Sequence, residues 1–117
     1  MSLRIFNALG MTLLLAACGA GESPPPPGDE VECALGAGAA LSPVCTLEVV
    51  AGGGEIVLHH PDGGFRRLAR DPATGTLTPR DGADPLVIEA DDQGALAFAI
   101  GADRYRIPRR LLAPPPQ

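Results

Sequence analysis

The stretch that decides the fold is ALAFAIGADRYRIP, residues 95–108. Large apolar side chains alternate with alanines in ALAFAI, and RYRI shows a similar alternation after Gly101-Ala102-Asp103. A period of two places successive side chains on opposite faces of a β-strand. The stretch therefore predicts two strands, each with one apolar face.

Similar short runs precede this stretch, and turn-forming sequences separate them. The runs are TLEVV (46–50), EIVLHH (55–60), FRRLAR (65–70), TLT (76–78) and LVIEA (86–90). Between the second and third runs, Pro61-Asp62-Gly63-Gly64 suits a type I turn with a glycine in the left-handed conformation. Strands about ten residues apart predict an all-β fold, a small antiparallel meander sheet or barrel of six to seven strands.

The predicted core consists of the apolar members of these runs. They are Leu47, Val49, Ile56, Leu58, Phe65, Leu68, Leu86, Ile88, Leu96, Phe98, Ile100, Tyr105 and Ile107. The register of 65–70 stays open, because a slip of one residue exchanges the two faces. After the last run, Arg109-Arg110-Leu111-Leu112 is expected to cap one end of the sheet.

The N-terminal third has a different composition. An apolar run at 5–17 follows Arg4, and as a helix it would extend about 20 Å, too short for a bilayer core of about 30 Å. It is typical of a secretory signal peptide. We therefore predict a signal peptide at 1–17, a disordered Gly/Pro-rich tether at 18–32, a β domain at 33–112 and a disordered Pro-rich tail at 113–117.

The end of the apolar run, Leu15-Ala16-Ala17-Cys18, resembles the lipobox of bacterial lipoproteins. The resemblance implies diacylglycerol on the Cys18 thiol, cleavage before Cys18 and acylation of the new amino group. Several acyl chains would form a stable membrane anchor. Gly19, where an aspartate would favour the inner membrane, implies the periplasmic face of the outer membrane. The segments ECAL, PVCTLE and HPDGGFRRL also resemble uncharacterised small bacterial lipoproteins. This resemblance suggests a family and does not indicate an activity.

The other two cysteines, Cys33 and Cys45, are predicted to form a disulfide, because disulfides persist in exported proteins. The small loop that they would close implies a stabilisation of about 3 kcal/mol. The alternative is a zinc site with His59 and His60. It is disfavoured because adjacent residues of a strand point to opposite faces, so we predict no metal and no cofactor.

Composition and motifs argue against two classes of function. The net charge of −5 disfavours a nucleic-acid partner, which requires a basic surface. Ser23 lies in the tether and Ser42 stands beside Pro43, and neither sits in a nucleophile-elbow sequence. We therefore expect a non-enzymatic domain that contacts an envelope protein or glycan.

One group of residues is a candidate for contact with an anionic surface: Arg66, Arg67, Arg70, Arg104 and Arg106. Guanidinium groups bind phosphate bidentately, provided that the fold brings them together. The alternative is a solvated face balanced by nearby acidic residues.

A second resemblance concerns Asp103-Arg104-Tyr105 and the β-rich pattern. Both are similar to membrane-bound inhibitors of c-type lysozyme, which are lipobox proteins with an eight-stranded barrel. The cysteine placement differs and no inhibitory loop residues match, so no site is carried over. This resemblance implies an alternative function as a periplasmic, lysozyme-inhibitor-like binding protein.

Overall fold

The structure is a computed structural model that describes residues 24–82, 84–92 and 94–113. Its strands are β1 (Asp29–Ala34), β2 (Ser42–Val49), β3 (Glu55–His59), β4 (Phe65–Arg70), β5 (Leu77–Pro79), β6 (Leu86–Asp91), β7 (Ala95–Ile100) and β8 (Asp103–Pro108). A short helix, α1 (Arg109–Leu112), follows β8. The predicted signal peptide and Cys18 lie outside the described residues, as do residues 114–117 of the predicted tail. In the part that is described, no helix is long and apolar enough to cross a membrane.

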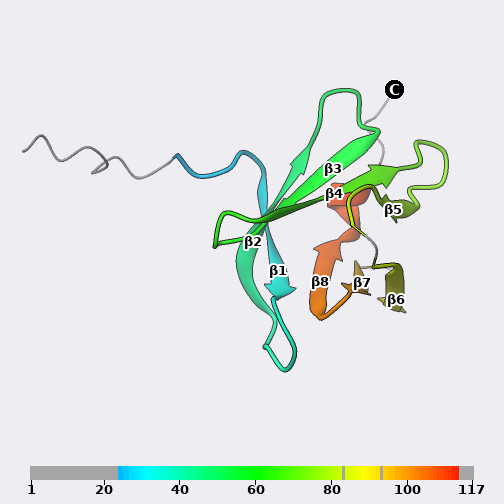
Figure 1. Cartoon of the computed structure of the whole chain (residues 1–117). Helices are drawn as coiled ribbons and strands as arrows, with labels where there is room; N and C mark the ends of the chain where they lie inside the picture. Colours follow the sequence, from blue (N-terminus) through cyan, green and yellow to red (C-terminus); the bar gives the residue numbers. More distant parts are fainter. Residues whose placement is uncertain (1–23, 83, 93, 114–117) are drawn as a thin grey trace, which may run out of the picture.

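All eight strands belong to one antiparallel sheet in the order β5-β4-β3-β2-β1-β8-β7-β6 (Figure 1). Each strand pairs with its neighbour in sequence, except that β1 also pairs with β8 and that β5 and β6 end the sheet. These two end strands approach each other, so that the sheet nearly closes into a barrel. The predicted all-β antiparallel fold is confirmed, with eight strands in place of six to seven.

The additional strand is β1, which begins at Asp29 and therefore inside the segment predicted as tether. Its side chains alternate, with Val31 and Cys33 buried and Glu30 and Glu32 facing outward. The tether prediction is thus wrong for its last four residues. The acidic composition obscured a strand that has only two apolar positions before Ala34.

The core lies inside the barrel, and most of its predicted members are buried. Three are exposed instead: Val49, Phe65 and Ile88 have exposed fractions of 46%, 48% and 51%. Leu86 is partly buried and packs against the core. Val49 is the last residue of β2, Phe65 faces outward opposite His59, and Ile88 lies on the end strand β6. The core also contains buried residues that were not predicted: Val31, Cys33, Cys45, Leu77 and Leu112.

Two connections fix the N-terminal strand. Cys33 and Cys45 form the predicted disulfide, which joins β1 to β2 with a Cα–Cα distance of 5.9 Å. Just before β1, Gly28 has a φ of +132°, and a Cβ atom there would overlap the carbonyl of Leu47. Only glycine allows the incoming chain to approach β2 this closely.

At the opposite end of the chain, α1 covers one end of the barrel, as predicted. Leu112 is 4% exposed and packs into the core. The turn between β3 and β4 is also confirmed: Gly63 N donates to His60 O at 3.1 Å, and Gly63 has a φ of +91°.

Candidate functional site

The five arginines predicted as an anionic-surface contact do not share one surface. On β4, Arg66 and Arg70 lie on the same side as the buried Leu68, whereas Arg67 faces outward. Arg104 and Arg106 face outward on β8. Three strands separate β4 from β8 in the sheet. The alternation of β4 and the closure of the barrel therefore distribute the five guanidinium groups over different regions.

The two arginines of β8 have partners on neighbouring segments. Arg104 Nη2 donates a hydrogen bond to Ala39 O at 2.7 Å, and Arg106 Nη1 pairs with Glu32 Oε2 at 3.4 Å. These contacts tie β8 to β1 and to the loop before β2. They favour a structural role over a phosphate site.

Arg70 closes the end of the barrel where α1 lies. Its side chain is buried, with Nε donating to Gly53 O at 2.8 Å and Nη1 donating to Leu112 O at 3.1 Å. The carbonyl groups at the end of a helix lack partners within the helix, so a guanidinium group there satisfies them and stabilises the helix end.

At the opposite end, Arg66 connects β4 to β8 across the interior. Its Nε donates to Tyr105 Oη at 3.0 Å, and its Nη2 donates to Asp103 Oδ2 at 2.9 Å. Asp103 Oδ1 in turn accepts a hydrogen bond from Gly36 N at 2.8 Å. His60 Nε2 lies 2.8 Å from Tyr105 Oη and completes a polar cluster of Arg66, Asp103, Tyr105 and His60, here called the interior cluster.

The interior cluster shifts the pKa of each of its members. Burial raises the pKa of Tyr105 to about 12, against the lowering effect of Arg66. Burial also lowers the pKa of His60, although Asp103 and Asp62 act to raise it. For Asp103 burial has the raising effect, but hydrogen bonds from Arg66 and from the Gly36 backbone lower its pKa overall.

These directions define the proton positions in the interior cluster. For Arg66, burial has the lowering effect, yet its hydrogen bonds to Asp103 and Tyr105 raise its pKa, so it is a permanent cation. Because Tyr105 Oη accepts from Arg66, its own proton is available to neutral His60, and we assign this bond as Tyr105 donating to His60 Nε2. The interior cluster is a hydrogen-bonded polar closure of one barrel end.

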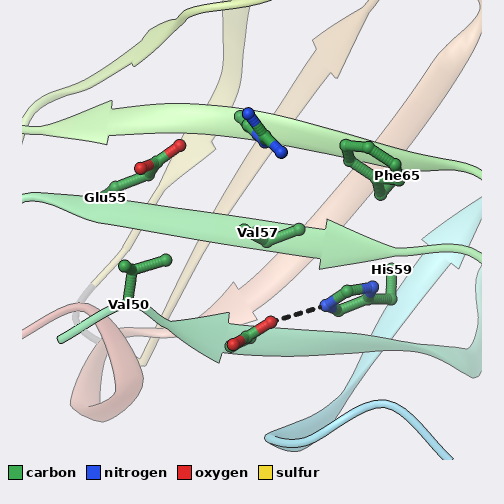
Figure 2. A pocket seen from close by; sticks show the side chains of 7 residues that line it. Val50, Glu55, Val57, His59 and Phe65 are labelled. Carbon is green, nitrogen blue, oxygen red and sulfur yellow. Dashed lines mark hydrogen bonds and ion pairs between the residues drawn. The ribbon is translucent and has the colours of Figure 1, made fainter.

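A groove lies on the outer face of β2, β3 and β4 (Figure 2). Its volume is about 470 Å³, and the residues that line it are Glu48, Val50, Glu55, Val57, His59, Phe65 and Arg67. We call it the outer groove. Adjacent strands supply these side chains because the registers Glu48–Val57 and Val57–Arg67 place them on the same face.

Two side-chain pairs define the character of the outer groove. The guanidinium carbon of Arg67 lies 5.4 Å from the centre of the Phe65 ring, within the range of a cation–π contact. On the β2 side of the groove, His59 Nε2 lies 2.8 Å from Glu48 Oε1. A dashed line from His59 marks this interaction in Figure 2. The lining combines an apolar floor with charges of both signs and contains no hydroxyl, thiol or amine.

The outer groove was not identified from the sequence. The sequence pattern predicts Phe65 in the core and Arg67 in one group with the other arginines. The signal that could have found it is the alternation of FRRLAR: if Leu68 faces inward, then Phe65 and Arg67 must share the outer face.

The structure also bears on the alternative zinc site. Cys33 and Cys45 are bonded to each other and offer no thiolate. His59 pairs with Glu48 in the outer groove, whereas His60 bonds to the buried Tyr105. The expectation that adjacent histidines face opposite sides is thus confirmed. Among the described residues, no group of three or more His, Cys, Asp and Glu side chains could hold a metal ion.

In comparisons with known proteins, no family model, curated protein or solved structure matches this chain.

Proposed function

We propose that this chain is a lipid-anchored protein of the bacterial envelope whose β domain binds a partner through the outer groove. In this proposal Cys18 carries the acyl chains and the periplasmic face of the outer membrane is the location. The domain acts without catalysis or cofactor, and its partner is an envelope protein or glycan. The Leu15–Cys18 lipobox supports the anchor, and the disulfide is consistent with an oxidising compartment.

The observation that carries the binding role is the exposed Phe65–Arg67 pair. Phe65 leaves 48% of its surface in contact with solvent, although only two aromatic side chains of the described residues, Phe98 and Tyr105, lie in an otherwise aliphatic core. Aromatic and arginine side chains are enriched at protein contact sites, where a central apolar anchor is surrounded by polar groups. Val57 beneath and Glu48, Glu55 and His59 around this pair provide that arrangement. A protein segment is therefore the favoured partner.

The experiment is site-specific photo-crosslinking in the producing cell. A benzophenone-bearing phenylalanine replaces Phe65, and in a matched control it replaces Glu30, an exposed residue on the outer face of β1. The proposal predicts one defined adduct from position 65, identified by mass spectrometry as protein or glycan. It also predicts that Arg67→Ala reduces this adduct by about tenfold, since hot-spot truncations cost more than 1 kcal/mol.

Two results would contradict the role of the outer groove. One is the absence of an adduct at position 65, and the other is the same set of adducts at positions 65 and 30. Neither result would bear on the proposal that Cys18 carries a membrane anchor.

A second candidate is lysozyme inhibition, which the eight-stranded, nearly closed sheet favours. The resemblance to membrane-bound inhibitors of c-type lysozyme implies an eight-stranded barrel, and the sheet has this number of strands. The direct test is the rate of cell-wall hydrolysis by a c-type lysozyme with an excess of the full chain. A lower rate supports this candidate, whereas an unchanged rate removes it.

A further inference from the structure

β6 has one edge without a strand partner. It pairs with β7, and among the described residues no strand pairs with its other side. β5, at the opposite end of the sheet, is only three residues long and ends in Pro79. Between these two strands lies a cavity of about 370 Å³, whose lining includes Leu77, Leu86, Ile88 and Leu96. In the described part of the chain, no strand pairing therefore closes the barrel along this seam, although the two strands approach each other.

The edge carries exposed apolar side chains on both faces. Val87 is 56% exposed and lies opposite Ala99, whereas Ile88 is 51% exposed and lies opposite the buried Phe98. Edge strands with unpaired backbone groups are templates for an additional strand, and natural proteins usually shield them. The β6 edge therefore offers a partner both unpaired backbone hydrogen-bonding groups and exposed apolar side chains.

Acidic side chains surround the same edge. Asp84 precedes β6, and Glu89, Asp91 and Asp92 lie within it or directly after it, all of them exposed. Asp91 is paired with Arg109 of α1, so Asp84, Glu89 and Asp92 are the acidic groups available to a partner. If two copies paired antiparallel through β6, Asp84 of one copy would approach the acidic end of the other. Like charges in such positions repel each other, and the chain as a whole carries −5. The charge pattern thus disfavours a second copy and is complementary to a basic strand.

We propose that the β6 edge binds an extended segment of another protein in which apolar and basic residues alternate. The segment would add a ninth strand through main-chain hydrogen bonds, its apolar side chains covering Val87 and Ile88 and its basic side chains facing Glu89 and Asp84. This surface is separate from the outer groove, and the inference does not depend on the function proposed above.

The test uses the full chain and a capped nine-residue peptide of alternating arginine and valine. Amide hydrogen exchange is measured with and without the peptide. The proposal predicts slower exchange at 86–91, and no effect from a peptide with glutamate in place of arginine. Glu89→Arg is expected to weaken binding about tenfold, because it replaces an attraction with a repulsion. Glu30→Arg on β1 makes the same change of charge and is expected to leave the affinity within about twofold.

Several results would overturn the proposal. The first is that amide exchange at 86–91 is unchanged by the peptide. The second is that the peptide slows exchange only in the strands of the outer groove. The third is that Glu89→Arg and Glu30→Arg reduce the affinity for the peptide equally. A dimer that buries β6 without the peptide, detected by sedimentation and exchange, would identify a second copy as the occupant and would also overturn it. Unchanged exchange in β7 and β8 verifies that Glu89→Arg remains folded.

Discussion

At the scale of single residues, Tyr105 is the centre of the polar end of the barrel. It is 1% exposed, stacks on Phe98 with ring centres 5.3 Å apart, and shares its hydroxyl between Arg66 and His60. The buried hydroxyl donates one hydrogen bond and accepts another. If the hydroxyl were removed, a buried partner would lose its hydrogen bond at a desolvation cost of about 1–3 kcal/mol. Tyr105 therefore connects the apolar core to the interior cluster.

The first prediction concerns the ionisation of Tyr105. Its pKa is raised to about 12, mainly by burial, so the folded state retains the phenolic proton that the unfolded state releases near pH 10. This contribution to stability is complete below pH 10 and is lost as the pH rises toward 12. The chain has one tyrosine and no tryptophan, so near-ultraviolet absorbance of tyrosinate reports this residue directly. A midpoint near 10 in the folded chain would contradict the interior cluster.

The second prediction concerns His60, whose pKa is lowered from 6.5, chiefly by burial. Below pH 6.5 the unfolded state then binds more protons than the folded state. The contribution of His60 to the free energy of unfolding is therefore complete above pH 6.5 and decreases as the pH falls below this value. Denaturant unfolding on both sides of pH 6.5 measures this slope. In His60→Gln the decrease across this interval is expected to become smaller. An equal decrease in the variant would assign the pH dependence to another group.

At the scale of elements, β1 depends on the close approach of Gly28 to β2. The third prediction is that Gly28→Ala lowers the free energy of unfolding by about 2 kcal/mol, because a side chain meets both the positive φ and the Leu47 carbonyl. Gly54→Ala is the matched control, since a Cβ at Gly54 meets no atom within 4 Å. Chemical denaturation measures both variants, and equal losses would contradict the close approach.

The fourth prediction concerns the disulfide between β1 and β2. Cys33 and Cys45 are separated by 12 residues, and the crosslink restricts the unfolded chain. Replacing both by alanine is expected to lower the free energy of unfolding by about 3 kcal/mol or more, since the crosslink is lost and both positions are buried. Denaturant unfolding of the variant against the oxidised wild type measures the difference. A loss below about 1 kcal/mol would indicate that strand pairing alone holds β1.

Whether an element could be predicted from the sequence depended on how its apolar residues are arranged. Regular alternation made 86–90 and 95–100 readable as strands. β1 was missed because acidic residues occupy its outward positions. Arg66 could not be placed inside, because the partners that make its burial tolerable, Asp103 and Tyr105, lie more than 35 residues further along the chain.

At the scale of the whole molecule, the residues that stabilise the fold are different from those of the two candidate binding surfaces. The core, the interior cluster and Arg70 hold the barrel from inside and at both ends. The outer groove and the β6 edge lie outside this framework, on different strands. The candidate surfaces required the three-dimensional register, whereas the anchor proposal rests on the sequence around Cys18. Changes at Phe65 or Glu89 are accordingly expected to alter binding more than folding.

The most direct test of the central claim is the intact mass of the protein purified from its natural membrane. The lipobox interpretation predicts a chain that begins at Cys18, carries the mass of its acyl groups, and lacks two hydrogen atoms because Cys33 and Cys45 are joined. A product that retains residues 1–17, or one with a free thiol at Cys18, would contradict the claim.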